Sequence, residues 1–267
     1  MGVTKMKGRG LLSLITYSEK RKDLLFLIDE KPRTLFEIKE FFNVKTPEIY
    51  PRIKELLEAD LIQKTNNEYY LTPIGKVILK YYTPLVEILN VFEETSDFWT
   101  DHDTNAIPHH LLERFNELEN SILFQDPSKN VFEQNKIIVE KLDAAQKVSG
   151  IISVFMPSSL EMIQEMVKNK TPSRIIMTQD VYDKFRLDYK ELLQQFLALK
   201  DNELYLIDSV NLFIITTEGF LYFSLFYKNG LYDAQKYLVA TDNRSLNWGN
   251  DCFKYFVEHA KKVDKLE

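Results

Sequence analysis

Residues 46–58 are TPEIYPRIKELLE, and this short segment predicts the central helix of the N-terminal region. Thr46 supplies a capping hydroxyl, Pro47 suits the first helical position, and Glu48 places a carboxylate in the first turn. Apolar residues then recur at helical spacing and give this helix one buried face: Ile49, Ile53, Leu56 and Leu57.

The segments on either side of this helix predict two more helices and a hairpin. Apolar residues at helical spacing predict helices at about 20–31 and 34–42, and Pro32 separates the two. Beyond residue 60, two β-prone segments flank the turn Thr65-Asn66-Asn67. Residues 20–72 therefore predict three helices followed by a two-stranded hairpin, which is the element order of a winged helix-turn-helix.

Such a unit binds DNA by placing one helix in the major groove and a hairpin against the backbone. The third helix offers Arg52 to guanine and Glu48 to a cytosine amine, and Thr46 or Tyr50 to a phosphate or a thymine methyl. The predicted DNA-binding residues on helix and hairpin are Lys45, Thr46, Glu48, Tyr50, Arg52, Lys54, Lys64, Asn66 and Asn67. The alternative is a dimerisation module without DNA contact, and Glu48 and Glu55 favour it because carboxylates repel phosphates.

Length and charge distribution are compatible with this prediction. At 267 residues the chain is long enough for two domains at about 150 residues each. The net charge is −6, but residues 1–85 carry 15 Lys and Arg against 11 Asp and Glu, about +4, which leaves about −10 for the rest. The N-terminal region is therefore the part of the chain expected to contact double-stranded DNA.

The sequence also narrows the compartment and the cysteine chemistry. There is no secretory signal and no apolar run of the roughly 20 residues that span a bilayer, so we expect a cytoplasmic protein with no membrane partner. Cys252 is the single cysteine, which excludes an internal disulfide, a thiolate-rich metal site and a two-thiol redox switch.

The rest of the chain predicts a helical connector and an α/β domain. A helix starts at Thr72-Pro73, Pro84 marks a predicted kink in it, and residues 96–148 have a helical pattern with polar breaks. Beyond Gly150, strand and helix patterns alternate, with one long helix over 182–199, and predict a mixed sheet covered by helices. The predicted fold class is α+β, with a winged helix-turn-helix at 1–83, a helical connector and dimerisation segment at 84–148, and an α/β effector-sensing domain at 149–267.

A resemblance to a known family rests on several strings of residues. The winged-helix strings are 46–49, 51–56, 61–62 and 70–75, and those of the second domain are Phe98-Trp99, His102-Asp103, Ile107-Pro108, 247–249 and 252–256. Together they resemble archaeal winged-helix transcriptional regulators related to the methanogenesis regulators. The resemblance covers about residues 20–258 and implies transcriptional control, an archaeal source and a homodimer. Some relatives switch through cysteines, and the lone Cys252 departs from that pattern.

The chain contains one catalytic tripeptide motif and one group of possible metal ligands, and each has a simpler interpretation. The α/β region loosely resembles half of a phospholipase D-like domain, but its one His-Xaa-Lys tripeptide, His259-Ala260-Lys261, has Leu266 where that motif needs an aspartate. His102, His109 and His110 could ligate a metal with Asp101 or Asp103, although adjacent histidines are more often surface or packing residues. We therefore expect no enzyme, no cofactor and no metal.

A sensing role requires a ligand site in the α/β domain. Phe220, Tyr222 and Phe226 fall on one face of a predicted strand and could line an apolar pocket, with Arg174 as a partner for an anion. The alternative is that both faces of this strand are core or a dimer seam. Arg186 and Arg244 could likewise meet an anion, or be ordinary surface charges.

The predicted function is that of a homodimeric DNA-binding regulator controlled by a small-molecule effector. The alternatives are an enzyme of phosphodiester or transferase chemistry that uses the winged helix for dimerisation or targeting, and a protein-binding adaptor. The predicted dimer seam is an apolar stripe on the helix after the hairpin: Ile74, Val77, Ile78, Tyr81, Leu85, Ile88, Leu89 and Phe92. The competing arrangement folds residues 111–123 back over this stripe within one chain.

Overall fold

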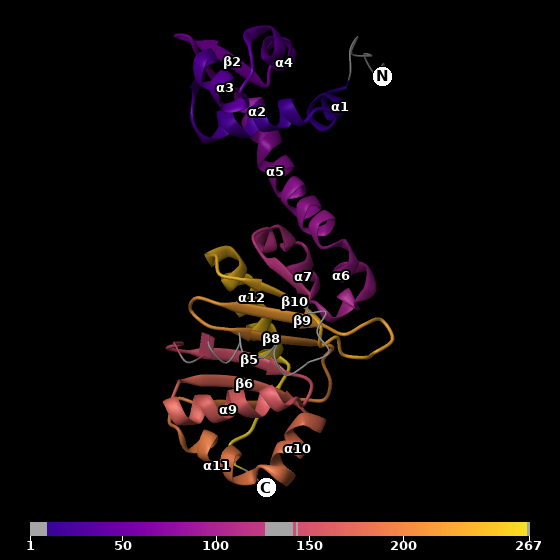
Figure 1. The fold of residues 1–267 in the computed structure, drawn as a ribbon, viewed down its shortest axis with the longest axis vertical. Coiled ribbons are helices and arrows are strands. Elements are labelled where there is room, and N and C mark those ends of the chain that lie inside the picture. The colour runs from indigo at the N-terminus through magenta and orange to yellow at the C-terminus, as the bar shows by residue number, and fades with distance from the viewer. Residues whose placement is uncertain (1–9, 126–140, 143, 266–267) are drawn as a thin grey trace. The chain divides into compact units, whose positions relative to one another are not determined.

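The computed structural model describes residues 10–125, 141, 142 and 144–265. The chain divides into two compact units, residues 1–86 and 87–267, each with its own hydrophobic core (Figure 1). Helix α5 (Pro73–Glu94) begins in the first unit, runs through Pro84 and ends in the second. Among the described residues, no helix is both long enough and apolar enough to cross a membrane.

The first unit contains the predicted helices and hairpin. Its elements are α1 (Leu11–Thr16), α2 (Glu19–Glu30), β1 (Arg33–Thr34), α3 (Leu35–Phe42), α4 (Thr46–Glu58), β2 (Ile62–Thr65) and β3 (Glu68–Leu71). Strand β1, which the sequence did not reveal, pairs antiparallel with β3 and gives a three-stranded sheet of order β1-β3-β2. The apolar faces of α2, α3 and α4 meet in one core that includes Leu24, Ile38 and Ile53, all 0% exposed.

Local chemistry fixes the boundaries of these elements. Thr34 and Glu37 form a capping box at the start of α3, in which the Thr34 N–H donates to Glu37 Oε2 at 2.8 Å. Asn43 ends α3 in the left-handed conformation, with φ of 48°. Asn66 and Asn67 have φ of 52° and 65°, which is the geometry that closes a two-residue hairpin.

The start of α5 lies tightly against the end of α4. The Thr72 hydroxyl donates to Asp60 O at 2.5 Å and accepts from the Gly75 N–H at 3.0 Å, so it caps α5 as predicted. A Cβ at Gly75 would lie 2.1 Å from Leu61 O. Only glycine fits at this approach of helix to strand.

The second unit is built on an eight-stranded mixed sheet. Its strands are β4 (Ile122–Gln125), β5 (Val148–Ile152), β6 (Ser173–Thr178), β7 (Glu203–Ile207), β8 (Leu212–Thr216), β9 (Leu221–Leu225), β10 (Lys236–Ala240) and β11 (Lys261–Lys262). Their order is β11-β7-β6-β5-β8-β9-β10-β4. The β5-β6 and β6-β7 pairs are parallel and all other pairs are antiparallel.

Helices cover both faces of this sheet and create two cores. One face is covered by α9 (Pro157–Asn169), α10 (Gln179–Asp188) and α11 (Lys190–Ala198). The other carries α6 (Ser96–Asp101), α7 (His109–Leu112), the 3-10 turn η2 (Phe115–Leu118) and α12 (Asn243–Glu258), together with Val91 of α5. A further 3-10 turn, η1 (Thr104–Ala106), joins α6 to α7. The predicted α+β class with a mixed sheet is therefore present.

Two predicted elements are wrong. Residues 122–125 were expected to be helical, but they form edge strand β4, which pairs with β10 while the Phe124 ring stacks on Tyr237 at 5.6 Å. The helix expected over 182–199 is two helices, α10 and α11, which separate at Tyr189. In both places contacts with distant residues override the local pattern.

Candidate nucleic-acid interface

Helix α4 has one buried and one exposed face. Ile49, Ile53 and Leu56 are 0% exposed. Arg52 is half-buried, whereas the other polar residues predicted on this helix are exposed: Lys45, Thr46, Glu48, Tyr50 and Lys54. The structure therefore brings the predicted helix residues together on the outer side of α4.

The start of α4 differs from the prediction in one respect. Thr46 does not cap the helix, because it is the first helical residue and Lys45 occupies the cap position. The cap contact instead runs from the Lys45 N–H to Glu48 Oε1, at 3.1 Å. Glu48 thus stabilises the start of its own helix. Because Oε1 already accepts this bond, only Oε2 is left to contact a base.

The two basic side chains within α4, Arg52 and Lys54, differ in the contacts that they already make. Arg52 Nη1 donates to Glu48 O at 2.8 Å, which leaves the other guanidinium nitrogens without a bond among the described residues. Lys54 Nζ lies 3.6 Å from Glu58 Oε1 in a pair that is more than 60% exposed on both sides. Exposed pairs of this kind contribute little and exchange readily for a phosphate.

Glu55, the other carboxylate on α4 that would repel phosphates, forms an ion pair within the first unit. Arg21, on α2, donates from Nη1 to Glu55 Oε2 at 2.5 Å and from Nε to Leu14 O at 2.6 Å. The Arg21 side chain is 5% exposed. No local pattern in the sequence indicates this pair, because its members are 34 residues apart.

The hairpin presents its predicted residues to solvent. Lys64, Asn66 and Asn67 are all exposed. Lys64 Nζ lies 5.4 Å from the centroid of the Tyr69 ring, which is its partner across the β2-β3 ladder. A lysine held over a ring in this way keeps its charge at the surface.

In the second unit, the predicted aromatic residues are part of the core. Phe220 and Tyr222 pack in the core beneath α9, α10 and α11, and are 2% and 4% exposed, while Phe226 is half-buried and contacts the Tyr232 ring at 5.2 Å. The predicted alternation along β9 is present, since Leu221 and Phe223 belong to the other core. Core packing is the alternative that the sequence left open for these residues.

Arg174 is the predicted effector residue that lines a cavity. The cavity has a volume of ≈ 560 Å³, and its charged lining consists of Arg114, Lys147, Arg174, Lys254, Glu218 and Asp251. The two other arginines considered from the sequence have partners: Arg244 donates to both carboxylate oxygens of Glu87, at 3.1 and 2.8 Å, and Arg186 lies 3.5 Å from Asp183.

His102, considered as a metal ligand, has a different environment. Its Nε2 lies 3.1 Å from Asp233 Oδ2 and its Nδ1 lies 2.6 Å from Phe98 O, while its ring stacks on Tyr227 at 4.7 Å. The His102 and Asp233 side chains are 0% and 1% exposed. Burial and the neighbouring Asp233 raise the pKa of Tyr227 to about 12. No cluster of three His, Cys, Asp or Glu side chains suited to a metal occurs within the described residues.

Cys252 is also buried, at 0% exposure, on the inner face of α12. Burial raises the pKa of its thiol well above the ordinary value. A thiol in this state is a poor nucleophile.

A family model and a named relative both match this chain. Residues 131–259, which include β5 to β10 and α9 to α12, match the family model for the middle domain of the methanogenesis regulatory protein FilR1. Over 254 residues the chain is 22% identical to the FilR1 protein of Methanothrix harundinacea (strain 6Ac), across 93% of this chain and 57% of that protein. The predicted resemblance to archaeal methanogenesis regulators is confirmed. The chain spans little more than half the length of this FilR1 protein.

Solved structures give weaker likenesses. TrmBL2, described as an archaeal chromatin protein with a novel mode of DNA binding, aligns over 97% of this chain and 100% of its own, with 16% identity and a TM-score of 0.43. The phosphatidylserine synthase of Haemophilus influenzae Rd KW20 aligns over 54% of this chain and 39% of its own, with 14% identity and a TM-score of 0.41. Scores of this size do not establish a shared fold.

Proposed function

We propose that the chain is a homodimeric, DNA-binding transcriptional regulator whose first unit is a winged helix. The observation that carries the proposal is the outer face of α4, where Lys45, Tyr50 and Lys54 are exposed opposite a buried apolar face. The hairpin after it exposes Lys64, which adds a further cation. A helix with this face and a basic hairpin suit a major groove and its flanking phosphates.

The charge balance of this face favours DNA. Glu55 is paired with Arg21, whereas Glu48 accepts a bond from the Lys45 N–H and keeps its charge. The exposed cations Lys45, Lys54 and Lys64 outnumber it. We assign Lys54 and Lys64 to phosphates and Arg52 to a base edge, because a guanidinium with free nitrogens can pair with guanine.

The test is binding of the full chain to an operator selected from random DNA. Lys54→Ala should weaken binding by removing a phosphate contact. Lys184→Ala is the matched control, since Lys184 also lies on a helix in an exposed i, i+4 ion pair, with Asp188 on α10. Equal affinity of both variants and the parent would remove α4 from the interface. If no operator can be selected, the dimerisation or adaptor role is favoured instead.

Homodimerisation is proposed from the exposed apolar side chains of α5. In the first unit Ile74, Val77, Tyr81 and Leu85 are 50%, 60%, 70% and 50% exposed, and their spacing places them along one side of the helix. Ile78, by contrast, packs against the core of the first unit. A second copy of the chain would bury this stripe, and two winged helices could then reach two half-sites.

Solution mass tests the seam. The parent should have twice the chain mass, and Val77→Glu combined with Tyr81→Glu should reduce it to one chain, because two carboxylates would be buried without partners. Lys76→Glu, exposed on the same helix and away from the stripe, controls for added negative charge. A monomeric parent, or a dimeric double variant, would contradict the seam.

A further inference from the structure

Three polar side chains lie side by side across the middle of the large sheet. Ser149 of β5 is in register with Arg174 of β6 on one side and with Thr216 of β8 on the other. Positions two residues away on these strands, Ile151, Ile176 and Ile214, all belong to the core under α12. Since side chains alternate along a strand, the polar row faces α12 as well.

Helix α12 forms the wall above this row. Thr216 Oγ1 donates to Asn250 Oδ1 at 3.0 Å, and a Cβ at Gly249 would lie 2.9 Å from Thr216 Cγ2, so the helix approaches the sheet closely here. The Arg174 guanidinium lies 5.1 Å from the centroid of the Phe253 ring. Row and wall enclose the ≈ 560 Å³ cavity, whose size is that of a small-molecule site.

The cavity has unused hydrogen-bond donors. Ser149 is only 6% exposed, lines the cavity, and its hydroxyl has no hydrogen bond within the described part of the chain. Lys147 is exposed at the rim, and its ammonium has no partner among the described residues. Arg174 uses Nε for Glu203 Oε2, at 3.1 Å. These donors face one cavity and are available to a ligand that accepts hydrogen bonds.

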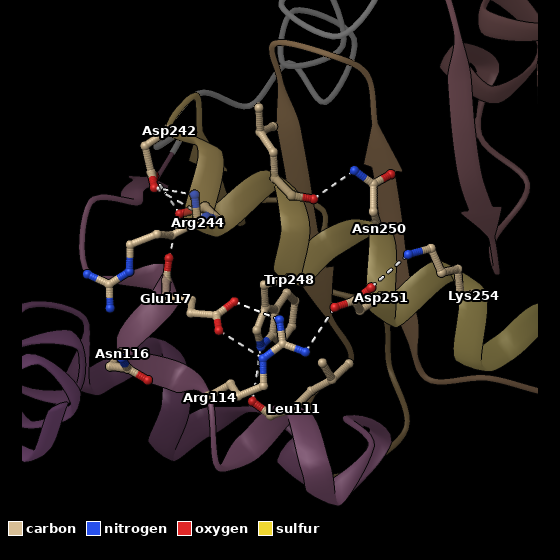
Figure 2. Close-up of polar contacts among 12 residues, drawn as sticks. Leu111, Arg114, Asn116, Glu117, Asp242, Arg244, Trp248, Asn250, Asp251 and Lys254 are labelled. Carbon is tan, nitrogen blue, oxygen red and sulfur yellow. Dashed lines mark hydrogen bonds and ion pairs between the residues drawn. The ribbon is translucent and has the colours of Figure 1, made fainter. Parts of the chain in front are cut away.

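The charges indicate the sign of that ligand. Four cationic side chains line the cavity, and only Glu218 and Asp251 oppose them. Both carboxylates already accept bonds, Glu218 from the Gln146 N–H at 2.9 Å and Asp251 from Arg114 and Lys254, each at 2.9 Å (Figure 2). We infer that the cavity binds a small organic anion, with its carboxylate or phosphate held by Lys147, Arg174 and Ser149.

The surroundings of Arg114 suggest how such a ligand could act as an effector, a role that rests on the proposed function. Arg114 lines the cavity and donates to Glu117 on η2 through two bonds of 2.8 Å (Figure 2). The neighbouring Asn116 donates to Glu87 on α5 at 3.0 Å. The short turn η2 thus contacts both the cavity, through Glu117 and Arg114, and α5, through Asn116.

The binding test uses the full chain without DNA. Inorganic phosphate, citrate and uncharged glycerol are titrated by calorimetry at constant ionic strength, so that phosphate and carboxylate are distinguished. We expect one site per chain for one of the two anions and none for glycerol. Lys147→Gln and Ser149→Ala should each weaken it about tenfold, as loss of a hydrogen bond to a charged group does. Lys190→Gln, an exposed lysine on α11 outside the cavity, should leave it unchanged.

Two results would overturn the site: no binding of either anion, or equal affinity of Lys147→Gln and Lys190→Gln for it. Ser149 is buried and Lys147 is exposed, and both line the same cavity. If one variant fails to fold, the other still tests the site. A second titration measures operator affinity with and without the bound anion. An unchanged operator affinity would overturn the effector role alone, and absence of DNA binding with intact anion binding would overturn the proposed function alone.

Discussion

Replacing His102 by Gln tests the buried pair that joins α6 to the segment between β9 and β10. Each ring nitrogen of His102 lies within hydrogen-bonding distance of an acceptor, Phe98 O at 2.6 Å and Asp233 Oδ2 at 3.1 Å. The ring therefore joins the backbone of α6 to the Asp233 carboxylate through two buried contacts. The single amide nitrogen of a glutamine cannot occupy both positions.

The expected loss in the free energy of unfolding follows from burial. The two side chains are 0% and 1% exposed, so the substitution leaves the buried Asp233 carboxylate without one of its hydrogen bonds. Loss of a hydrogen bond to a charged group costs about 1.5–3 kcal/mol. His109→Gln is the control, because the His109 side chain is 85% exposed and its loss should change stability by no more than about 0.5 kcal/mol.

Tryptophan fluorescence in urea measures this loss for the second unit. The chain has two tryptophans, Trp99 and Trp248, and both are buried in that unit. An unfolding free energy for His102→Gln within about 1 kcal/mol of the parent would refute the reasoning, because loss of a buried hydrogen bond to a charged group predicts a larger penalty.

The pH dependence provides a second check. Burial alone would raise the pKa of Asp233, but hydrogen bonds from His102, the Gln235 N–H and Tyr227 outweigh it and hold the pKa below its ordinary value. The stabilisation by Asp233 is therefore fully present above an ordinary carboxyl pKa of about 3.9, and is lost as pH falls through the lowered value. The difference between parent and His102→Gln should therefore shrink as pH falls below about pH 4.

Three further predictions concern the first unit. Lys64→Ala should reduce the slope of log affinity for DNA against log salt by about 1, measured by fluorescence anisotropy, and an unchanged slope would exclude the hairpin from phosphate contact. Thr34→Ala should lower the unfolding free energy by about 1 kcal/mol by removing the capping box, measured by circular dichroism in urea; Thr65→Ala, at an exposed hairpin position, is its control. Gly75→Ala should cost about 1–3 kcal/mol in the same assay, since its Cβ would overlap Leu61 O, and a neutral result would contradict the close approach.

The sequence predicted elements whose determinants are local. Thr34 and Glu37 cap α3, Asn66 and Asn67 turn the hairpin, and Thr72 caps α5, each within a few residues of its partner. Helical spacing was sufficient to separate the buried and exposed faces of α4. Periodicity and capping therefore gave the architecture of the first unit without any knowledge of tertiary contacts.

The elements that were missed depend on distant partners. Strand β4 pairs with β10 more than 100 residues later, and the short apolar run around Phe124 does not distinguish a strand from a helix. The break at Tyr189 has neither glycine nor proline to mark it. The cavity residues could not be predicted together for the same reason. Ser149, Arg174 and Thr216 become neighbours only when three strands pair in register.

The burial of Cys252 has a practical consequence for testing the proposed dimer by distance measurement. The native chain has one cysteine, and its thiol is inaccessible and reluctant to ionise. A cysteine introduced at an exposed position outside the proposed DNA-binding face, such as Phe36 on α3, would therefore be the site that takes a nitroxide spin label, without prior removal of the native residue. If the chain forms the proposed dimer, pulsed electron resonance would report the distance between the two labels directly, with DNA or an anion present or absent.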